Sequence, residues 1–235
     1  FGLETTQLKF GRNSLSELGW ELKKYNCKNV LLVVDPVLHN YDVTKKIIGQ
    51  IKSVGAKEII YDNISVEPTL RSFESASDFA KEIFFDLIIA AGGGSTIDTA
   101  KVTNLIKVCN GKVMDYVNPP IGKGKQPTSK LLPLIAIPTT SGSGSEATSV
   151  AVLDIPELKL KTGISHNFLR PSLALVDPEL SKTTPSGVTA SSGLDVICHA
   201  IESYISKPYN LRSKPRSPDE RPPYQGSNPV SDVWS

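Results

Sequence analysis

The stretch of residues 86–101, DLIIAAGGGSTIDTAK, decides the fold of this chain. The apolar run 87–91 is too short to cross a membrane and is typical of a strand buried on both faces of a parallel sheet. The glycines at 92–94 allow positive φ angles and close backbone approach, and Ser95 with Asp98 has the spacing of a capping box. The stretch therefore predicts a buried strand, a tight turn and a helix start whose free N–H groups favour a phosphate.

The glycine turn departs from the best-known phosphate motifs. Ile97 stands where G-x-G-x-x-G has its last glycine, and the lysine of a P-loop is missing. Taken alone, the turn is equally consistent with a plain strand-to-helix connection. The rest of the chain must decide between these alternatives.

Length and composition describe an ordinary globular chain. With 235 residues, 39% of them hydrophobic, it can form one or two domains with a sizeable core. The net charge of +2, without a block of like charges, argues against a nucleic-acid partner. No apolar run reaches membrane length, and the first residues given have no signal or transit character. Because the chain begins at Phe1 and stops at Ser235, in a new helical region, we expect both ends to be cut.

The three cysteines, Cys27, Cys109 and Cys198, are widely spaced. Such spacing forms neither a disulfide framework nor a C-x-x-C metal site. Cysteine usage therefore favours an intracellular reducing compartment.

Strand and helix patterns alternate through most of the chain. Apolar periodicity predicts strands at 5–10, 29–34, 57–62, 87–91, 134–137 and 172–176, a hairpin from 148–154 and 158–163, and helices at 14–25, 43–54 and 72–84. This order predicts an α/β fold, a mostly parallel Rossmann-like dinucleotide-binding sheet wrapped by helices. The character changes between Ser181 and Pro185, so we expect a first domain at 1–183 and the beginning of an all-helical domain at 184–235.

Two further features lie at expected carboxyl ends of strands, where parallel sheets bind ligands. Asp35 follows the strand 29–34 and could accept hydrogen bonds from a ribose diol, or simply cap the turn at Pro36. Residues 138–146, PTTSGSGSE, form a second turn rich in hydroxyl and N–H groups. Two such turns after strands of one sheet favour a dinucleotide site more than either turn alone.

Asp195 and His199 are four residues apart in a predicted helix at 194–205, so their side chains share one face. A carboxylate and an imidazole so placed can bind one divalent cation, iron or zinc. An ordinary Asp–His hydrogen bond is the alternative. Leu194, Ile197 and Ile201 form an apolar stripe on the same helix, for which we expect packing partners outside this chain.

Taken together, GGGSTIDTAK, IPTTSGSGSEATS and GLDVICHAIESY resemble the iron-containing (group III) alcohol dehydrogenase family. The tail at 211–235, the YDN-x-x-VEPT segment and the PPIGKGK segment resemble the hydroxyacid-oxoacid transhydrogenase branch of that family. The resemblance covers essentially the whole chain. It implies an N-terminal domain that binds NAD and a helical domain that holds the metal.

The resemblance also implies a set of site residues. Asp35 would meet the adenosine ribose and favour NAD over NADP, and Asp195 with His199 would be the first two metal ligands, the other two being expected beyond Ser235. Lys161 matches the family's lysine near the cofactor, although Lys159 lies only two residues away. The remaining implied cofactor contacts are Gly92, Gly93, Gly94, Ser95, Asp98, Thr139, Thr140 and Ser143.

The implied reaction is hydride transfer from a hydroxy acid such as 4-hydroxybutyrate to an oxo acid such as 2-oxoglutarate, through bound NAD and a divalent metal. The resemblance places the parent protein in the mitochondrial matrix and allows a homodimer; its other partners are small molecules. Two alternatives stay open. The first is a simple NAD-dependent alcohol dehydrogenase, and the second is a truncated product that does no chemistry.

Overall fold

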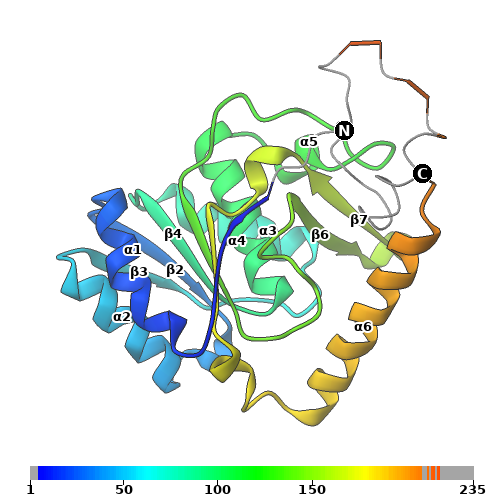
Figure 1. Ribbon diagram of the computed structural model, residues 1–235. Coiled ribbons are helices and arrows are strands. Elements are labelled where there is room, and N and C mark those ends of the chain that lie inside the picture. The colour runs from blue at the N-terminus through cyan, green and yellow to red at the C-terminus, as the bar shows by residue number, and fades with distance from the viewer. Residues whose placement is uncertain (1–4, 208–210, 212, 215, 218–235) are drawn as a thin grey trace. The chain divides into compact units, whose positions relative to one another are not determined.

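The computed structural model describes residues 5–207, 211, 213, 214, 216 and 217. Its main feature is a six-stranded sheet in the order β1-β8-β5-β4-β2-β3, in which every neighbouring pair is parallel (Figure 1). The strands are β1 (Gln7–Phe10), β2 (Asn29–Val34), β3 (Lys57–Tyr61), β4 (Leu87–Gly92), β5 (Leu134–Pro138) and β8 (Leu173–Val176). The predicted α/β fold with a parallel sheet is confirmed.

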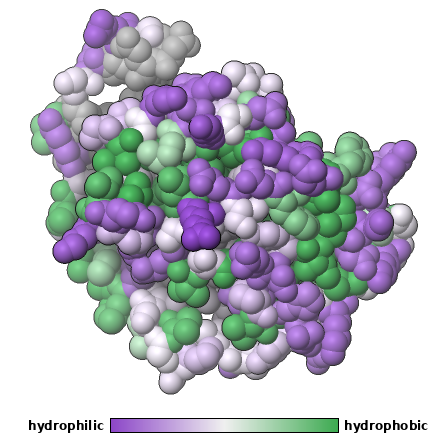
Figure 2. Space-filling view, turned by 180° about the vertical axis from the view of Figure 1, so that it is seen from behind, coloured by the Kyte–Doolittle hydropathy of each residue, from purple (hydrophilic) through white to green (hydrophobic). Residues whose placement is uncertain are grey.

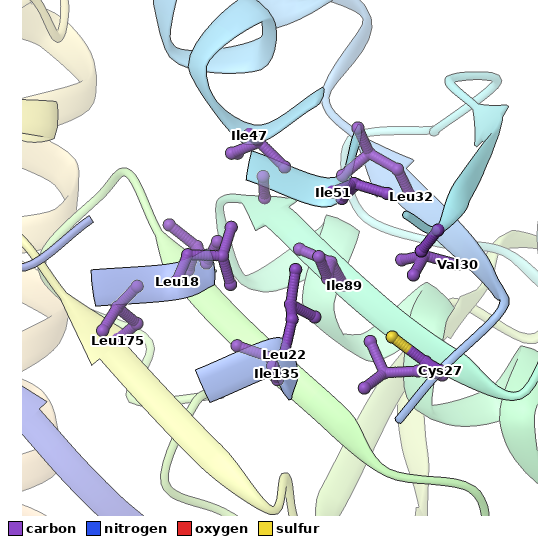
Figure 3. Packing of buried hydrophobic residues seen from close by; sticks show 14 of the residues in the cluster. Leu18, Leu22, Cys27, Val30, Leu32, Ile47, Ile51, Ile89, Ile135 and Leu175 are labelled. Carbon is purple, nitrogen blue, oxygen red and sulfur yellow. The ribbon is translucent and has the colours of Figure 1, made fainter. Parts of the chain in front are cut away.

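Helices cover both faces of this sheet, because its central strands are apolar on both sides. On one face, Leu18 and Leu22 of α1 (Leu18–Tyr25) and Ile47 of α2 (Asp42–Ser53) pack against the sheet (Figure 3). On the other face, a second cluster joins α3 (Leu70–Lys81) and α4 (Gly94–Cys109) to the alternate residues of β2, β4 and β5. Burial of this apolar area is the main driving force for the fold.

An antiparallel hairpin adds a layer outside α4. Its strands are β6 (Val150–Ile155) and β7 (Leu160–Ser165), and they share an apolar cluster with α4, α3 and the short helix α5 (Val113–Tyr116). The hairpin predicted at this place is therefore confirmed. Because α4 lies between sheet and hairpin, nearly all of its side chains are buried, from Thr96 to Ile106.

Several sequence-based boundaries differ from the structure. The helix expected at 14–25 begins as a 3-10 turn, Ser14–Glu17, and α3 runs two residues earlier at its start and three at its end than expected. Trp20, considered for the apolar face of that first helix, has 60% of its surface exposed and lies under the ammonium groups of Lys9 and Lys24. The other 3-10 turns are Pro36–Leu38, Pro156–Leu158, Asn167–Leu169 and Pro178–Ser181.

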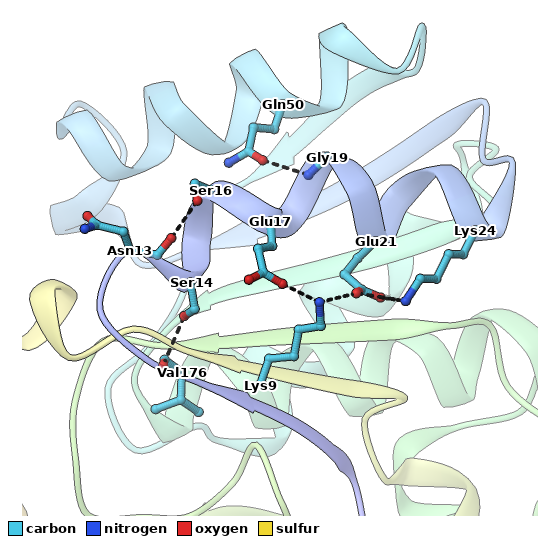
Figure 4. A network of polar contacts seen from close by, with 10 residues as sticks. All are labelled: Lys9, Asn13, Ser14, Ser16, Glu17, Gly19, Glu21, Lys24, Gln50 and Val176. Atoms are coloured by element: carbon cyan, nitrogen blue, oxygen red, sulfur yellow. Dashed lines mark hydrogen bonds and ion pairs between the residues drawn. The ribbon is translucent and has the colours of Figure 1, made fainter.

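Polar contacts fasten the edge strand β1 and helix α1 to the rest of the sheet (Figure 4). Lys9 of β1 forms ion pairs with Glu17 and Glu21. The Ser14 hydroxyl donates to the Val176 carbonyl of β8 at 3.1 Å, and the Gly19 N–H donates to the side chain of Gln50 on α2 at 2.7 Å. The last two contacts connect segments that are 162 and 31 residues apart in the sequence.

The described chain divides into two compact units. The sheet unit consists of Thr6–Thr140 and Gly144–Thr184; the α6 unit contains Thr5, Ser141–Ser143 and the described residues from Pro185 on, including α6 (Ser186–Ile205). The assignment of 1–183 and 184–235 as cofactor and metal domains stays a prediction. Most of the tail at 211–235, whose sequence resembles the transhydrogenase branch, lies outside the described residues.

Hydrophilic and hydrophobic residues are interspersed on the surface seen in Figure 2. In the part of the chain that the structure describes, no helix is both long and apolar enough to span a bilayer.

Candidate functional site

The strand order places a ligand-binding point between β2 and β4. From β2 the chain passes through α2 to β3 on one side, whereas β4 leads through α4 to β5 on the other side. In open parallel sheets, the carboxyl edge at such a reversal is where ligands bind. Asp35 and the glycine turn lie there side by side, since the Asp35 N–H donates to the Ala91 carbonyl at 3.1 Å.

The glycine turn provides the start of a helix without a side-chain cap. Gly93 is the N-cap of α4 and has extended backbone angles, with φ −77° and ψ −174°. Gly93 has no side chain to cap the helix, and the Thr96 N–H donates to the Gly93 carbonyl at 3.1 Å. Among the described residues, the N–H groups ahead of Thr96 and the helix dipole are therefore available to an anion. The expected capping box of Ser95 and Asp98 is wrong, because both side chains have other partners, described below.

The reason for glycine in this turn also differs from the expectation. None of Gly92, Gly93 and Gly94 has a positive φ angle. Instead, a Cβ atom on Gly92 would lie 2.4 Å from the hydroxyl oxygen of the buried Thr96, and one on Gly93 would lie 3.4 Å from that of Thr140. Glycine is needed at position 92 for close packing of the helix on the end of the strand, whereas the distance at Gly93 is close to ordinary van der Waals contact.

Asp35 is half-buried and caps the turn that follows β2. Its carboxylate accepts from the Val37 N–H at 2.9 Å. One of the two alternatives for Asp35, the turn cap, is thus observed, and a ribose contact stays a prediction. Beyond this turn a pocket of about 590 Å³ opens at the carboxyl edge, lined among others by Leu38, Tyr41, Lys46, Thr139 and Leu180. Its volume is in the range of small-ligand sites.

The second turn is divided between the two units. The Thr139 N–H donates to the Gly92 carbonyl at 3.0 Å, so Thr139 and Thr140 are held beside the glycine turn. Ser143 belongs to the α6 unit. Within that unit, a Cβ atom on Gly142 would lie 2.7 Å from the Ser192 carbonyl oxygen, which shows how closely this segment packs on α6.

The Asp98 carboxylate lies in a buried polar cluster, and its contact with the cofactor stays a prediction. One carboxylate oxygen accepts from the Val152 N–H at 2.9 Å, and the other lies 3.3 Å from the Lys101 ammonium. The Lys101 side chain is completely buried. Burial raises the pKa of Asp98 and lowers that of Lys101, while the opposite charge of the partner resists both shifts.

Glu67 connects the glycine turn to the hairpin. Its backbone N–H donates to the Ser95 hydroxyl oxygen at 3.2 Å, and its carboxylate forms a 2.8 Å ion pair with Lys161 of β7. Its φ of 54° is left-handed, an unusual conformation for a residue with a side chain. Lys161 is thus linked to Ser95 of the glycine turn through Glu67, and the choice between Lys161 and Lys159 as the cofactor lysine stays a prediction.

Sequence reasoning missed both Glu67 and Lys101. Glu67 lies in a loop whose sequence carries no motif with a mechanism. A signal for Lys101 was present: it stands three residues after Asp98 in a helix that has no continuous polar face. In a helix without a continuous polar face, two opposite charges three residues apart indicate a buried ion pair rather than two solvated side chains.

Asp195 and His199 lie on one face of α6, as predicted. The His199 Nε2 atom is 3.7 Å from a carboxylate oxygen of Asp195, and about half of each side chain is exposed. Oxygen and imidazole donors in this open arrangement suit a borderline divalent metal. Among the described residues, no group of three or more His, Cys, Asp or Glu side chains gathers into a metal site.

Comparisons with known proteins identify the family of the chain. Residues 5–178 match the family model of iron-containing alcohol dehydrogenases. The mitochondrial hydroxyacid-oxoacid transhydrogenases of Xenopus laevis and Homo sapiens are 46% and 44% identical to the chain over its whole length. The alignment covers 51% of each of these proteins, so the chain spans about half the length of the curated relatives it matches.

Solved structures show the same fold. An iron-containing alcohol dehydrogenase from Thermococcus thioreducens superposes with a TM-score of 0.79 at 30% identity, over 88% of this chain and 54% of the other. A sulfoacetaldehyde reductase from Bifidobacterium kashiwanohense, solved in complex with NAD+, gives a TM-score of 0.79 at 29% identity with the same coverage. With the family model matched over most of its length, the chain belongs to the iron-containing alcohol dehydrogenase family.

Proposed function

We propose that this chain is the cofactor-binding part of a hydroxyacid-oxoacid transhydrogenase. The observation that carries the proposal is the 44–46% identity, across the entire chain, to vertebrate proteins of that name. Those relatives are about twice as long as this chain. The activity is therefore proposed for the protein to which the chain corresponds, and the experiment below asks whether the chain itself has it. Their mitochondrial names support a mitochondrial location.

The carboxyl edge of the sheet would hold NAD. The uncapped N–H groups after Gly93 suit the pyrophosphate, and the pocket between Tyr41, Thr139 and Leu180 suits the adenosine. Asp35 would accept from the ribose hydroxyls and repel the 2′-phosphate of NADP. The proposed contacts of Gly92, Gly94, Ser95, Thr140, Ser143 and Lys161 complete this assignment.

Asp195 and His199 would supply two ligands to the metal, for which the family favours iron. A bound divalent metal would act as a Lewis acid on the substrate oxygen. A further two ligands would have to come from residues other than those described. The sheet unit, for its part, would bind and orient the cofactor.

The reaction balances as two hydride transfers. The carbon that bears the hydroxyl of a hydroxy acid such as 4-hydroxybutyrate gives its hydride to NAD+, and the hydroxyl proton leaves, which yields a carbonyl product. The hydride then passes from NADH to the carbonyl carbon of an oxo acid such as 2-oxoglutarate, whose oxygen takes up a proton. Cofactor is regenerated, so no net oxidant is consumed.

Deuterium transfer without added cofactor tests this proposal. The purified protein is incubated with iron, 4-hydroxybutyrate deuterated at the carbinol carbon, and 2-oxoglutarate. Deuterium in the 2-hydroxyglutarate product supports transhydrogenation through bound NAD. If no deuterium is transferred although calorimetry shows that the chain binds NAD, the transhydrogenase activity is excluded for this chain and only the cofactor-binding role stands.

A simple NAD-dependent alcohol dehydrogenase is the second candidate. It is favoured by the structural neighbours, which include alcohol dehydrogenases at 27–30% identity. Such an enzyme would convert the hydroxy acid only when NAD+ is added, with stoichiometric NADH formation. The same assay with and without NAD+ separates the two candidates.

A further inference from the structure

A buried lysine lies behind the glycine turn. Lys101 of α4 donates to the Val150 carbonyl at 2.6 Å and to the Thr148 hydroxyl at 3.2 Å, in addition to its contact with Asp98. Its side chain has no exposed surface. Burying an ammonium group is costly unless it is paired and hydrogen-bonded, and these three partners offset that cost.

The partners of Lys101 and Asp98 all lie on one segment. Lys101 contacts Thr148 and Val150, and Asp98 accepts from the Val152 N–H and from the Ser145 side chain. Residues 145–152 continue the second turn, which follows Thr139 and Thr140, into the hairpin strand β6. The buried pair thus fastens this segment to the first two turns of the helix that starts at the glycine turn.

Both members of the pair are occupied by protein partners. One Asp98 oxygen is engaged by a backbone N–H and the other by an ammonium group, and Lys101 is enclosed. A carboxylate would moreover repel a pyrophosphate, so direct contact with the cofactor is the weaker use for it. What the pair controls is where the segment 145–152 lies against α4.

We propose that Asp98 and Lys101 are positioning residues that hold the second turn in the shape required for cofactor binding. The inference rests on the proposed function in one respect, namely that the two turns bind NAD. Its mechanical part, that the pair orders residues 145–152, does not depend on that role. Both parts are tested by the same set of variants.

Three variants separate positioning from plain stabilisation. Lys101→Met leaves Asp98 buried and unpaired, and the double variant Asp98→Asn/Lys101→Met removes both charges. Lys107→Met is the matched control, because Lys107 lies on the same helix and also donates to backbone, to the Ile83 carbonyl at 2.7 Å, but far along α4 from the turn. The measurements are melting temperature, amide hydrogen exchange at 144–152, and the Kd for NAD.

Lys101→Met should lower the melting temperature by roughly 10 °C, because it leaves an unpaired buried charge. It should also speed amide exchange at 144–152 and weaken NAD binding by about tenfold or more, as expected for the loss of charge-assisted hydrogen bonds. The double variant should regain much of the lost melting temperature while fast exchange and weak NAD binding persist. Lys107→Met should lower the melting temperature with exchange at 144–152 and NAD affinity unchanged.

Two results would overturn the positioning role. One is a double variant in which exchange protection and NAD affinity return together with the melting temperature. The other is a Lys107→Met variant that loses NAD affinity as strongly as Lys101→Met does. If the unmodified chain binds no NAD, the proposed function fails, and the exchange data alone still decide whether the pair orders the segment.

Discussion

Asp35 has two tasks that one substitution can separate. Its carboxylate caps the turn after β2 by accepting from the Val37 N–H, and its charge is proposed to exclude the 2′-phosphate of NADP. Asparagine keeps an acceptor of the same length but removes the charge. Capping of the turn therefore depends on the shape of the side chain, whereas the proposed preference for NAD over NADP depends on its charge.

For Asp35→Asn we expect the affinity for NADP relative to NAD to rise by about tenfold or more, the scale of one charged interaction. Thermal stability should stay within about 2 °C, because asparagine caps as well as aspartate. Titration calorimetry with both nucleotides measures the ratio. Asp78→Asn, on an exposed aspartate of α3, is the control, and an unchanged ratio in Asp35→Asn would remove Asp35 from the ribose site.

Gly92 and Gly49 differ in the space that is available for a side chain, so alanine substitutions at the two positions test the steric explanation for Gly92. A Cβ at Gly92 would lie 2.4 Å from the Thr96 hydroxyl oxygen, whereas a Cβ at Gly49 in α2 meets nothing within 4 Å. We expect Gly92→Ala to lower the free energy of unfolding by about 1–3 kcal/mol through overpacking. Gly49→Ala should raise it by about 0.5–1 kcal/mol, since alanine is the better helix former. Urea titrations measure the change in the free energy of unfolding for each variant. Changes of the same sign and size in the two variants would contradict the steric argument.

At the scale of elements, the edge strand β1 is joined to α1 through the buried Glu21. Burial pushes the pKa of Glu21 upward, but the hydrogen bonds and charges of Lys24 and Lys9 outweigh it, so that the pKa is lowered overall. A carboxyl whose pKa is lower in the folded state stabilises the fold above its unfolded pKa. That stability is lost as the pH falls through the folded pKa.

The attachment of β1 should therefore weaken in acid. We expect the melting temperature of the protein to fall as the pH decreases from about 5 to 3, the range in which glutamates protonate. Glu21→Gln should show a smaller fall over the same range, together with a lower melting temperature at neutral pH. Glu74→Gln, on an exposed glutamate of α3, is the control and should follow the unmodified protein.

The elements that could be predicted are those whose signal is local. The strand expected at 29–34 matches β2, and the run 87–91 matches β4 to within one residue, because buried parallel strands are unbroken apolar runs. Helix ends were less accurate, since the start of α3 is set by the Thr69 cap and its backbone contacts. Helix α5 was missed because its four residues carry no periodicity.

At the scale of the whole molecule, α6 presents a large apolar surface. Leu194 is 63% exposed, and Ile197 and Ile201 are each 54% exposed. The predicted stripe is thus present and uncovered in the described structure. Contiguous apolar surface of this kind promotes association. We also expect limited proteolysis to cut the chain beyond about residue 185.

We expect the chain to bind a hydrophobic dye and to self-associate with rising concentration through this stripe. The double variant Leu194→Ser/Ile201→Ser should reduce both effects while the melting of the sheet unit is unchanged. Dye fluorescence and sedimentation velocity are the measurements. Leu158→Ser, at an exposed leucine of the hairpin turn that is 56% exposed, is the control, and an equal reduction in that variant would show that the stripe is not responsible.

The sequence by itself determined the parallel α/β fold, the glycine turn, the second turn and the Asp195–His199 pair, because apolar runs, glycines and helical spacing are local features. Only the tertiary structure decided the strand order that sets Asp35 beside the glycine turn, and the burial of Lys101 beneath the hairpin. It likewise decided that Glu67 connects Ser95 to Lys161. The physical reason is that strand order and burial depend on packing between segments tens of residues apart, which no local periodicity encodes.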